Sequence, residues 1–207
     1  MIISDNKKFI FVHIEKAGGT SIVHSLSDFA NPVAKTQLSS ALRFFGMPKN
    51  YRKYRYGRHS PLIDAETRMP KELFDDYYKF AFVRNPYDRL VSEYNAAIKK
   101  SRRARHRKIA ALESFEDFIR FEVKRGKFYQ LPLMTLSNGE LGLDFIGRFE
   151  NLVGDFEKIA NKLSIATKLE KRNAYAHKPY QEYYSSSAKD LVSQHWAEEL
   201  ECFDYRF

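Results

Sequence analysis

Two segments of the chain share a pattern in which a short apolar run precedes apolar residues at helical spacing. In the first, KFIFVHI is followed by Ile22, Val23, Leu26 and Phe29. In the second, FAFV at 80–83 is followed by Tyr87, Leu90, Val91, Tyr94 and Ile98. The period changes from that of a buried strand to that of an amphipathic helix. The pattern therefore predicts two strand–turn–helix units.

Four later segments extend this alternation. SFEDFIRFEVKRG predicts a helix with Ser114 as its cap, Asp117 at the capping-box position and Gly126 as its stop. DFIGRF is typical of a strand, and helical periodicity recurs in NLVGDFEKIANKL and SSAKDLVSQHWAEELECF. Alternating strands and helices favour an α/β fold. We predict three layers, with a mostly parallel sheet flanked by helices.

Length and composition limit the class of protein. The chain has 207 residues, and we expect one domain spanning 1–207. Its 43% hydrophobic and 15% aromatic content excludes a disordered or collagen-like protein. No run approaches the roughly 20 apolar residues of a membrane helix, and MIISDNKK lacks a signal-peptide pattern, so we expect a cytoplasmic protein without a membrane span. Because Cys202 is the only cysteine, we expect neither a disulfide nor a metal site.

The formal charge of +9 is concentrated in two segments, KNYRKYRYGRH before residue 60 and KKSRRARHRK at 99–108. Such clusters favour polyanionic partners, among them nucleic acid, an anionic lipid surface and a small phosphorylated ligand. A solvated face or loop is the simpler interpretation. In the first segment tyrosines alternate with cations, which suits an acidic sugar or single-stranded nucleic acid equally well.

The strand–helix turn HIEKAGGTS predicts an anion site. Gly18 and Gly19 let the backbone approach a ligand, and the N–H groups and dipole of a helix N-terminus attract negative charge. Lys16 precedes the glycines, whereas in the phosphate loop GxxxxGK[ST] the lysine follows them. Lys16 supplies a mobile charge, and Thr20 and Ser21 add hydroxyl donors from the first helical turn. A purely structural turn is the alternative.

The second unit, FAFVRNPYDRLVSEY, predicts a clamp for another phosphate. Arg84 lies at the end of the strand, and Ser92 lies about two turns into the helix. Each residue has a simpler interpretation. Arg84 suits a salt bridge at the sheet edge, and Ser92 suits a solvated helix position.

HIEKAGGTS followed by FAFVRNPYDRLVSEY resembles the paired signature of sulfotransferases that use 3′-phosphoadenosine 5′-phosphosulfate (PAPS), and specifically of carbohydrate sulfotransferases. IGRFENL and the tail NAYAHKPYQEYYSSSAKDLV are also similar to this family, so the resemblance covers nearly the whole chain. It implies an enzyme with a three-layer α/β fold related to P-loop nucleotide kinases, PAPS as co-substrate and a carbohydrate hydroxyl as acceptor. The family usually has Pro where this chain has Glu15, and often Thr where it has Ala17.

The resemblance also implies roles for individual residues. It assigns the 5′-phosphosulfate of the donor to Lys16, Ala17, Gly18, Gly19, Thr20 and Ser21. It assigns the 3′-phosphate to Arg84 and Ser92.

Sulfuryl transfer needs a cation beside the leaving oxygen and a base for the acceptor hydroxyl. We assign the cation to Lys16. A histidine, with an ordinary pKa of about 6.5, suits the base. The resemblance places this base at His59, whereas His13 is more typical of a hydrogen-bonded core histidine. Glu150 is a reserve base, for which a structural ion pair is the simpler interpretation.

Two other functions are consistent with parts of the sequence. A small-molecule kinase with a variant phosphate loop requires a Mg²⁺-binding hydroxyl after GK and an acidic strand end, and neither is clear here. A nucleic-acid or polyanion-binding module requires only the basic and aromatic runs, and its affinity should fall steeply with salt. We favour the sulfotransferase and do not expect nucleic acid as its partner.

Overall fold

The computed structural model describes residues 1–31, 51–53, 55–99, 104–169 and 178–207. The chain divides into two compact units. The first consists of Met1–Val83 and Leu131–Glu170, and the second of Arg84–Gln130 and Lys171–Phe207.

The first unit contains a four-stranded sheet with the strand order β1-β2-β3-β4. The strands are β1 (Ile2–Ser4), β2 (Phe9–Val12), β3 (Tyr78–Val83) and β4 (Phe145–Arg148). β1 is antiparallel to β2, whereas β2 with β3 and β3 with β4 are parallel. The predicted mostly parallel sheet is thus confirmed. The parallel register, with Val12 opposite Ala81 and Val83 opposite Arg148, brings the carboxyl ends of three strands to one edge.

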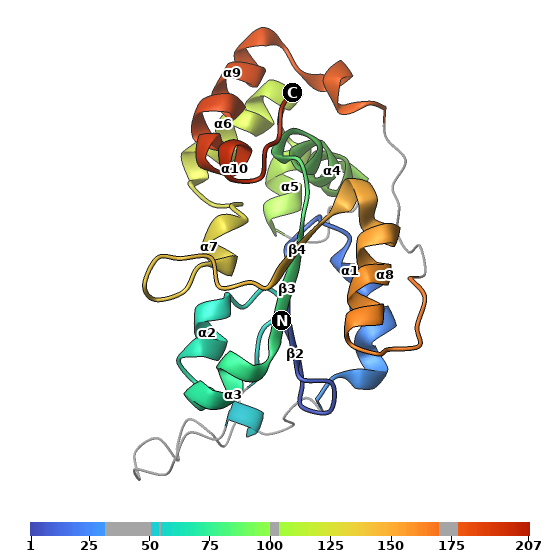
Figure 1. Ribbon diagram of the computed structural model, residues 1–207. Coiled ribbons are helices and arrows are strands. Elements are labelled where there is room, and N and C mark those ends of the chain that lie inside the picture. Colours follow the sequence, from blue (N-terminus) through green and yellow to red (C-terminus); the bar gives the residue numbers. More distant parts are fainter. Residues whose placement is uncertain (32–50, 54, 100–103, 170–177) are drawn as a thin grey trace. The chain divides into compact units, whose positions relative to one another are not determined.

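Helices cover both faces of this sheet (Figure 1). One face carries α1 (Gly19–Leu26) and α8 (Leu152–Lys162), and the other carries α2 (Leu62–Glu66), α3 (Lys71–Asp76) and α7 (Leu131–Met134). Short 3-10 turns are η1 (Ser27–Phe29), η4 (Tyr51–Lys53) and η5 (Phe149–Asn151). The core under α1 and α8 includes Phe9, Phe11, Phe80, Phe82, Ile22, Leu26, Phe156 and Ile159. Because both faces are covered, every residue of β2 is buried.

The second unit is helical. It contains α4 (Pro86–Lys99), α5 (Ala104–Ala110), α6 (Phe115–Arg125), η6 (Tyr180–Tyr183), α9 (Ser186–His195) and α10 (Ala197–Cys202). The caps predicted for α6 are confirmed. The side chain of Ser114 accepts a hydrogen bond from the backbone N–H of Asp117 at 3.1 Å, and Gly126 ends the helix with a φ of 57°.

The segment SSAKDLVSQHWAEELECF forms two helices rather than the single C-terminal helix that its periodicity predicts. The break lies at Trp196, whose φ of −110° and ψ of 24° are not helical. The indole of Trp196 is buried and donates to the carbonyl of Phe128 at 3.2 Å. Burial of this large ring fixes the corner between α9 and α10. In the described part of the chain, no helix has both the length and the apolar character needed to cross a membrane.

Candidate functional site

The turn between β2 and α1 has a constrained backbone. Lys16 has a φ of 67° and Gly18 a φ of 78°, both in the left-handed region. Lysine rarely adopts this conformation because its Cβ crowds the backbone. Non-glycine residues held in such conformations cluster at functional sites. The left-handed conformation of Lys16 is therefore a sign of function, because an ordinary strand–helix connection does not need it.

The N-terminus of α1 presents open N–H groups. Gly18 is the N-cap, and no side chain caps the helix. The Gly18 carbonyl accepts from the N–H groups of Ser21 and Ile22 at 3.1 and 3.4 Å. Among the described residues, the N–H groups of Gly19 and Thr20 have no acceptor. Uncapped N–H groups at the positive end of a helix dipole form an anion site.

Gly19 lies directly against the ring of His13. A Cβ on Gly19 would lie 2.0 Å from both Cδ2 and Nε2 of that ring. His13 is itself buried, with 4% of its surface exposed. The imidazole therefore supports the backbone of the turn from beneath, and only glycine leaves room for it.

Replacing Gly19 by alanine should destabilise the protein by about 1–3 kcal/mol, as expected for overpacking. The sign is informative, because a glycine-to-alanine change in an unstrained helical position ordinarily stabilises. Adding His13→Ala should reverse the sign, so that alanine at position 19 stabilises the His13→Ala protein. Urea unfolding of the four proteins in this double-mutant cycle measures the coupling. Additive effects would contradict the close contact.

Gly18 ties the turn to the IGRFENL stretch. A Cβ on Gly18 would lie 2.8 Å from Cδ2 of Leu152 and 3.3 Å from Cδ2 of Phe149. Phe149 and Leu152 come from η5 and the start of α8, so this stretch packs beneath the turn. Glu150 lies between them in η5 and is exposed. Its position beside two residues that support the turn keeps it a candidate for contact with a ligand.

His59 is placed so that one ring nitrogen is fixed and the other is available. Its Nδ1 lies 2.9 Å from the carbonyl oxygen of His13. A carbonyl oxygen only accepts, so Nδ1 carries the proton and, in the neutral ring, Nε2 carries the lone pair. The two imidazoles are close, with ring centroids 4.6 Å apart. His59 is exposed, so its Nε2 can serve as a base toward a ligand.

His13 does not have the properties of a base at neutral pH. Burial, followed by the charges of His59, the N-terminal ammonium and Arg58, lowers the pKa of His13 to about 3. Its Nδ1 is buried and has no hydrogen-bond partner among the described residues. The expectation that this ring is hydrogen-bonded is therefore wrong for Nδ1. His13 instead supports Gly19 through its ring and His59 through its carbonyl group.

In the second unit, Arg84 is held at both its side chain and its backbone. The Nε and Nη2 atoms of its guanidinium lie 2.8 and 2.7 Å from Oδ2 of Asp88, four residues further along the chain. Its backbone N–H donates to Oε1 of Gln130 at 3.0 Å, and its carbonyl accepts from Nε2 of Gln130 at 3.0 Å. A salt bridge is thus present, as the simpler interpretation of Arg84 required. It orients a guanidinium that has five N–H donors in all.

Ser92 lies in α4 and is only 8% exposed. The interpretation of Ser92 as a solvated helix position is therefore wrong. It belongs to the buried side of α4, together with Leu90 and Val91. A buried hydroxyl group that lacks a hydrogen bond costs free energy, whereas a solvated hydroxyl group can bond to water.

A protein-family model described as "Sulfotransferase family" matches residues 1–206. The chain belongs to the sulfotransferase family. A sulfotransferase of solved structure, mouse SULT7A1 complexed with PAP, has a TM-score of 0.58 to this chain at 14% sequence identity, over 98% of this chain and 87% of its own. This likeness confirms the predicted fold class. An uncharacterized protein of Archaeoglobus fulgidus is 31% identical over 116 residues, which make up 54% of this chain and 88% of that protein.

In the first basic segment of the sulfotransferase, Tyr51 is not the open aromatic surface that the composition of the segment predicts. Tyr51 is buried, and its hydroxyl donates to Asp5 at 3.1 Å. Arg52 pairs with the same carboxylate group at 2.6 Å. Tyr51 therefore cannot stack on a sugar or a base. Tyr54 lies outside the described residues.

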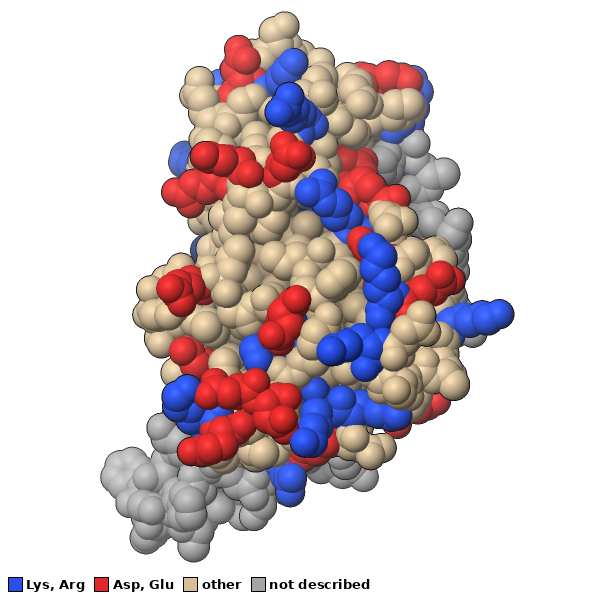
Figure 2. Space-filling model, in the orientation of Figure 1, with Lys and Arg blue, Asp and Glu red and all other residues tan. Residues whose placement is uncertain are grey.

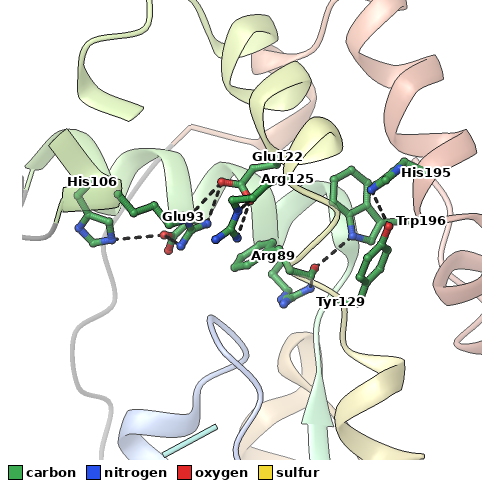
Figure 3. Close-up of polar contacts among 10 residues, drawn as sticks. Arg89, Glu93, His106, Glu122, Arg125, Tyr129, His195 and Trp196 are labelled. Carbon is green, nitrogen blue, oxygen red and sulfur yellow. Dashed lines mark hydrogen bonds and ion pairs between the residues drawn. The ribbon is translucent and has the colours of Figure 1, made fainter. Parts of the chain in front are cut away.

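The second basic segment, at 99–108, is partly engaged in ion pairs, and residues 100–103 lie outside the described residues. Nη1 of Arg105 and Nε2 of His106 lie 2.6 and 3.3 Å from the buried carboxylate of Glu93 (Figure 3). Arg107 and Lys108 are exposed. On the face drawn in Figure 2, basic and acidic side chains are interspersed.

Sequence reasoning missed three residues that hold Arg84. Asp88 lies four residues after Arg84 in the first turn of α4, and an opposite charge at this distance in the sequence was a usable signal. Gln130 lies 46 residues from Arg84, and Glu199, which contacts Gln130, lies 69 residues further along. No local pattern connects residues so far apart.

Proposed function

We propose that this sulfotransferase moves a sulfuryl group from PAPS to a hydroxyl of a carbohydrate acceptor. Family membership establishes sulfuryl transfer, and the assignment of the donor anion rests on the turn at 13–21. The observation that carries it is the uncapped N-terminus of α1 behind Lys16, with open N–H groups at Gly19 and Thr20. A phosphosulfate is the anion that this family of enzymes must bind.

The residues of the turn fit the 5′-phosphosulfate. Gly18 and Gly19 have no space for a Cβ, so the backbone itself forms the cradle. The Thr20 hydroxyl is exposed and can donate to a non-bridging oxygen. Ser21 and Ala17 are buried. We expect Ser21 to contribute to phosphosulfate binding through its hydroxyl group, and Ala17 through packing of the turn. Lys16 adds the positive charge.

Arg84 and Ser92 are assigned to the 3′-phosphate. The planar guanidinium suits a phosphate because its N–H groups match two oxygens at once. Asp88 orients this guanidinium, and Ser92 supplies a buried hydroxyl donor. The pair would distinguish PAPS from nucleotides that lack the 3′-phosphate.

Lys16 and His59 divide the chemistry between the leaving and the attacking oxygen. The ammonium of Lys16 stabilises the negative charge that forms on the leaving phosphate when its bond to sulfur breaks. Nε2 of His59 accepts the proton of the acceptor hydroxyl as that oxygen bonds to sulfur. The fixed Nδ1–H of His59 keeps Nε2 in this role. Glu150 is the reserve base.

A carbohydrate acceptor is supported by the surroundings of His59. Arg55 and Arg58 precede His59 and are exposed, so they can contact an acidic sugar. Because Tyr51 is buried, we assign acceptor recognition to these cations rather than to stacking.

The direct test is incubation with ³⁵S-labelled PAPS and a panel of acceptors: an acidic oligosaccharide, a neutral oligosaccharide, a tyrosine peptide and a simple alcohol. Labelled sulfate ester should form, and it should form fastest on an oligosaccharide. Labelled ATP, tested in parallel with Mg²⁺, should give no phosphorylated acceptor. Phosphoryl transfer from ATP without sulfuryl transfer from PAPS would contradict the proposal. Transfer to the peptide or alcohol alone would contradict only the carbohydrate assignment.

A further inference from the structure

We propose that Gln130 is a positioning residue that fixes the backbone of Arg84 and thereby sets the selectivity of the enzyme for a 3′-phosphate. This inference rests on the proposed function, in which Arg84 binds that phosphate. It concerns a buried hydrogen-bond network within the second unit.

The side-chain amide of Gln130 binds both polar groups of the Arg84 backbone. Oε1 accepts from the N–H of Arg84, and Nε2 donates to its carbonyl, both at 3.0 Å. Gln130 is completely buried, with 0% of its surface exposed. Two hydrogen bonds from one planar amide group fix both the position and the orientation of the Arg84 backbone.

Glu199 favours the same orientation of the Gln130 amide as the Arg84 backbone does. Its Oε1 accepts from the backbone N–H of Gln130, and its Oε2 accepts from Nε2 of Gln130 at 3.0 Å. A carboxylate only accepts, so the NH₂ group of Gln130 must face Glu199. Both hydrogens of that NH₂ group are then used, one by Glu199 and one by the Arg84 carbonyl. The amide is fully satisfied in one orientation only.

Arg89 supplies the positive charge that lets the Glu199 carboxylate remain buried. Its Nη1 lies 3.9 Å from Oε2 of Glu199 and donates to the carbonyl of Phe128 at 2.9 Å. Its guanidinium also lies 3.9 Å from the centroid of the Phe128 ring. Figure 3 shows Arg89 and the indole of Trp196 meeting at this carbonyl group. The segment that carries Gln130 is therefore held two residues before Gln130 itself.

This rigidity has a functional consequence, because phosphate recognition depends on the placement of the guanidinium. Asp88 fixes the end of the Arg84 side chain, and Gln130 fixes the backbone from which it extends. A shift of about 1 Å in a binding group is enough to lose much of its effect. Loss of the Gln130 amide should therefore weaken binding of the 3′-phosphate while leaving contacts to the rest of the nucleotide unchanged.

The test compares two ligands that differ only in that phosphate, 3′-phosphoadenosine 5′-phosphate and adenosine 5′-phosphate, by calorimetric titration. The ratio of their affinities is measured for the wild type, Gln130→Met and Glu199→Gln. Gln130→Met removes both bonds at nearly constant volume. Glu199→Gln leaves one side-chain oxygen for two donors, the backbone N–H and the NH₂ group of Gln130, so one of these two bonds is lost. Arg84→Ala removes the guanidinium group itself and sets the largest loss of the affinity ratio that the other variants can approach.

Glu122→Gln is the matched control. Glu122 is as buried as Gln130 and loses the same charge as Glu199, but its hydrogen-bond partners are Arg105 and Arg125 (Figure 3). It should therefore lower the melting temperature without altering the affinity ratio. A residue with a merely structural role would behave in this way, so the ratio separates positioning from stability.

In the wild type, the 3′-phosphate should raise affinity at least about tenfold, as a charged hydrogen-bond pair does. Gln130→Met should reduce this preference about fivefold or more, with the affinity for adenosine 5′-phosphate changed less than about twofold. If Gln130→Met does not fold, Glu199→Gln must show a loss of this preference in the same direction. A folded Gln130→Met protein with the wild-type affinity ratio would overturn the role of Gln130, and so would an equal loss of that ratio in Glu122→Gln. Neither result would affect the proposed function. No preference in the wild type would overturn the proposed donor as well.

Discussion

Replacing Lys16 by methionine should lower kcat for sulfuryl transfer by about a hundred- to a thousandfold, the usual effect of removing one group that stabilises a developing negative charge. Methionine has a similar length and no charge. Lys16 has a φ of 67°, and both side chains have the same unbranched Cβ, so the strain of the turn is retained. The loss should therefore report the ammonium group rather than the fold. Steady-state kinetics with saturating PAPS measure it.

Lys16→Arg is the matched variant, because it keeps the charge but replaces a compact ammonium group by a planar fork. Its kcat should lie between those of the wild type and Lys16→Met. Thermal unfolding of both variants should remain close to that of the wild type. Activity of Lys16→Met within about tenfold of the wild type would remove Lys16 from the leaving side of the reaction, given the effect expected of such a group.

Replacing His59 by asparagine should lower kcat by about a hundred- to ten-thousandfold, the range for loss of a general base. Asparagine keeps an N–H donor near the position of Nδ1, which can still bond the His13 carbonyl group, but it has no atom at the position of Nε2. The local structure should thus survive while the base is lost. The affinity for 3′-phosphoadenosine 5′-phosphate should change less than about twofold, because this residue faces the acceptor.

Glu150→Gln provides the comparison for His59→Asn. If His59 is the base, Glu150→Gln should retain most of the wild-type kcat. His13 is a poor substitute, because its ring is buried and that burial lowers its pKa to about 3. Full turnover in His59→Asn, with a large loss in Glu150→Gln, would transfer the role to the glutamate.

Features of the fold that depend on neighbouring residues could be predicted from the sequence. The change of period after KFIFVHI identified β2 and α1, and the same change identified β3 and α4. Ser114 and Gly126 marked both ends of α6, because capping depends on residues within one turn of a helix end. The sulfotransferase family could also be predicted, because the motifs that resemble it lie in the two strand–helix segments β2–α1 and β3–α4.

Features that depend on distant residues could not be predicted. The Gln130 amide is significant only because Arg84 and Glu199 meet it in the folded chain, and a lone glutamine has no pattern. The corner at Trp196 arises from burial of its indole against Phe128, which helical periodicity does not reveal. Tyr51 looked like a stacking surface because composition says nothing about burial. The single domain, the cytoplasmic location and the roles of the site residues stay predictions.

The central proposal is that the enzyme binds an adenine nucleotide that carries phosphates at both its 5′ and 3′ positions. The most direct measurement is calorimetric titration of the unmodified protein with 3′-phosphoadenosine 5′-phosphate, adenosine 5′-phosphate and ATP, without added metal. The account predicts the tightest binding for the first ligand, by at least about tenfold over each of the others. Equal affinity for the first two, or a preference for ATP, would contradict it.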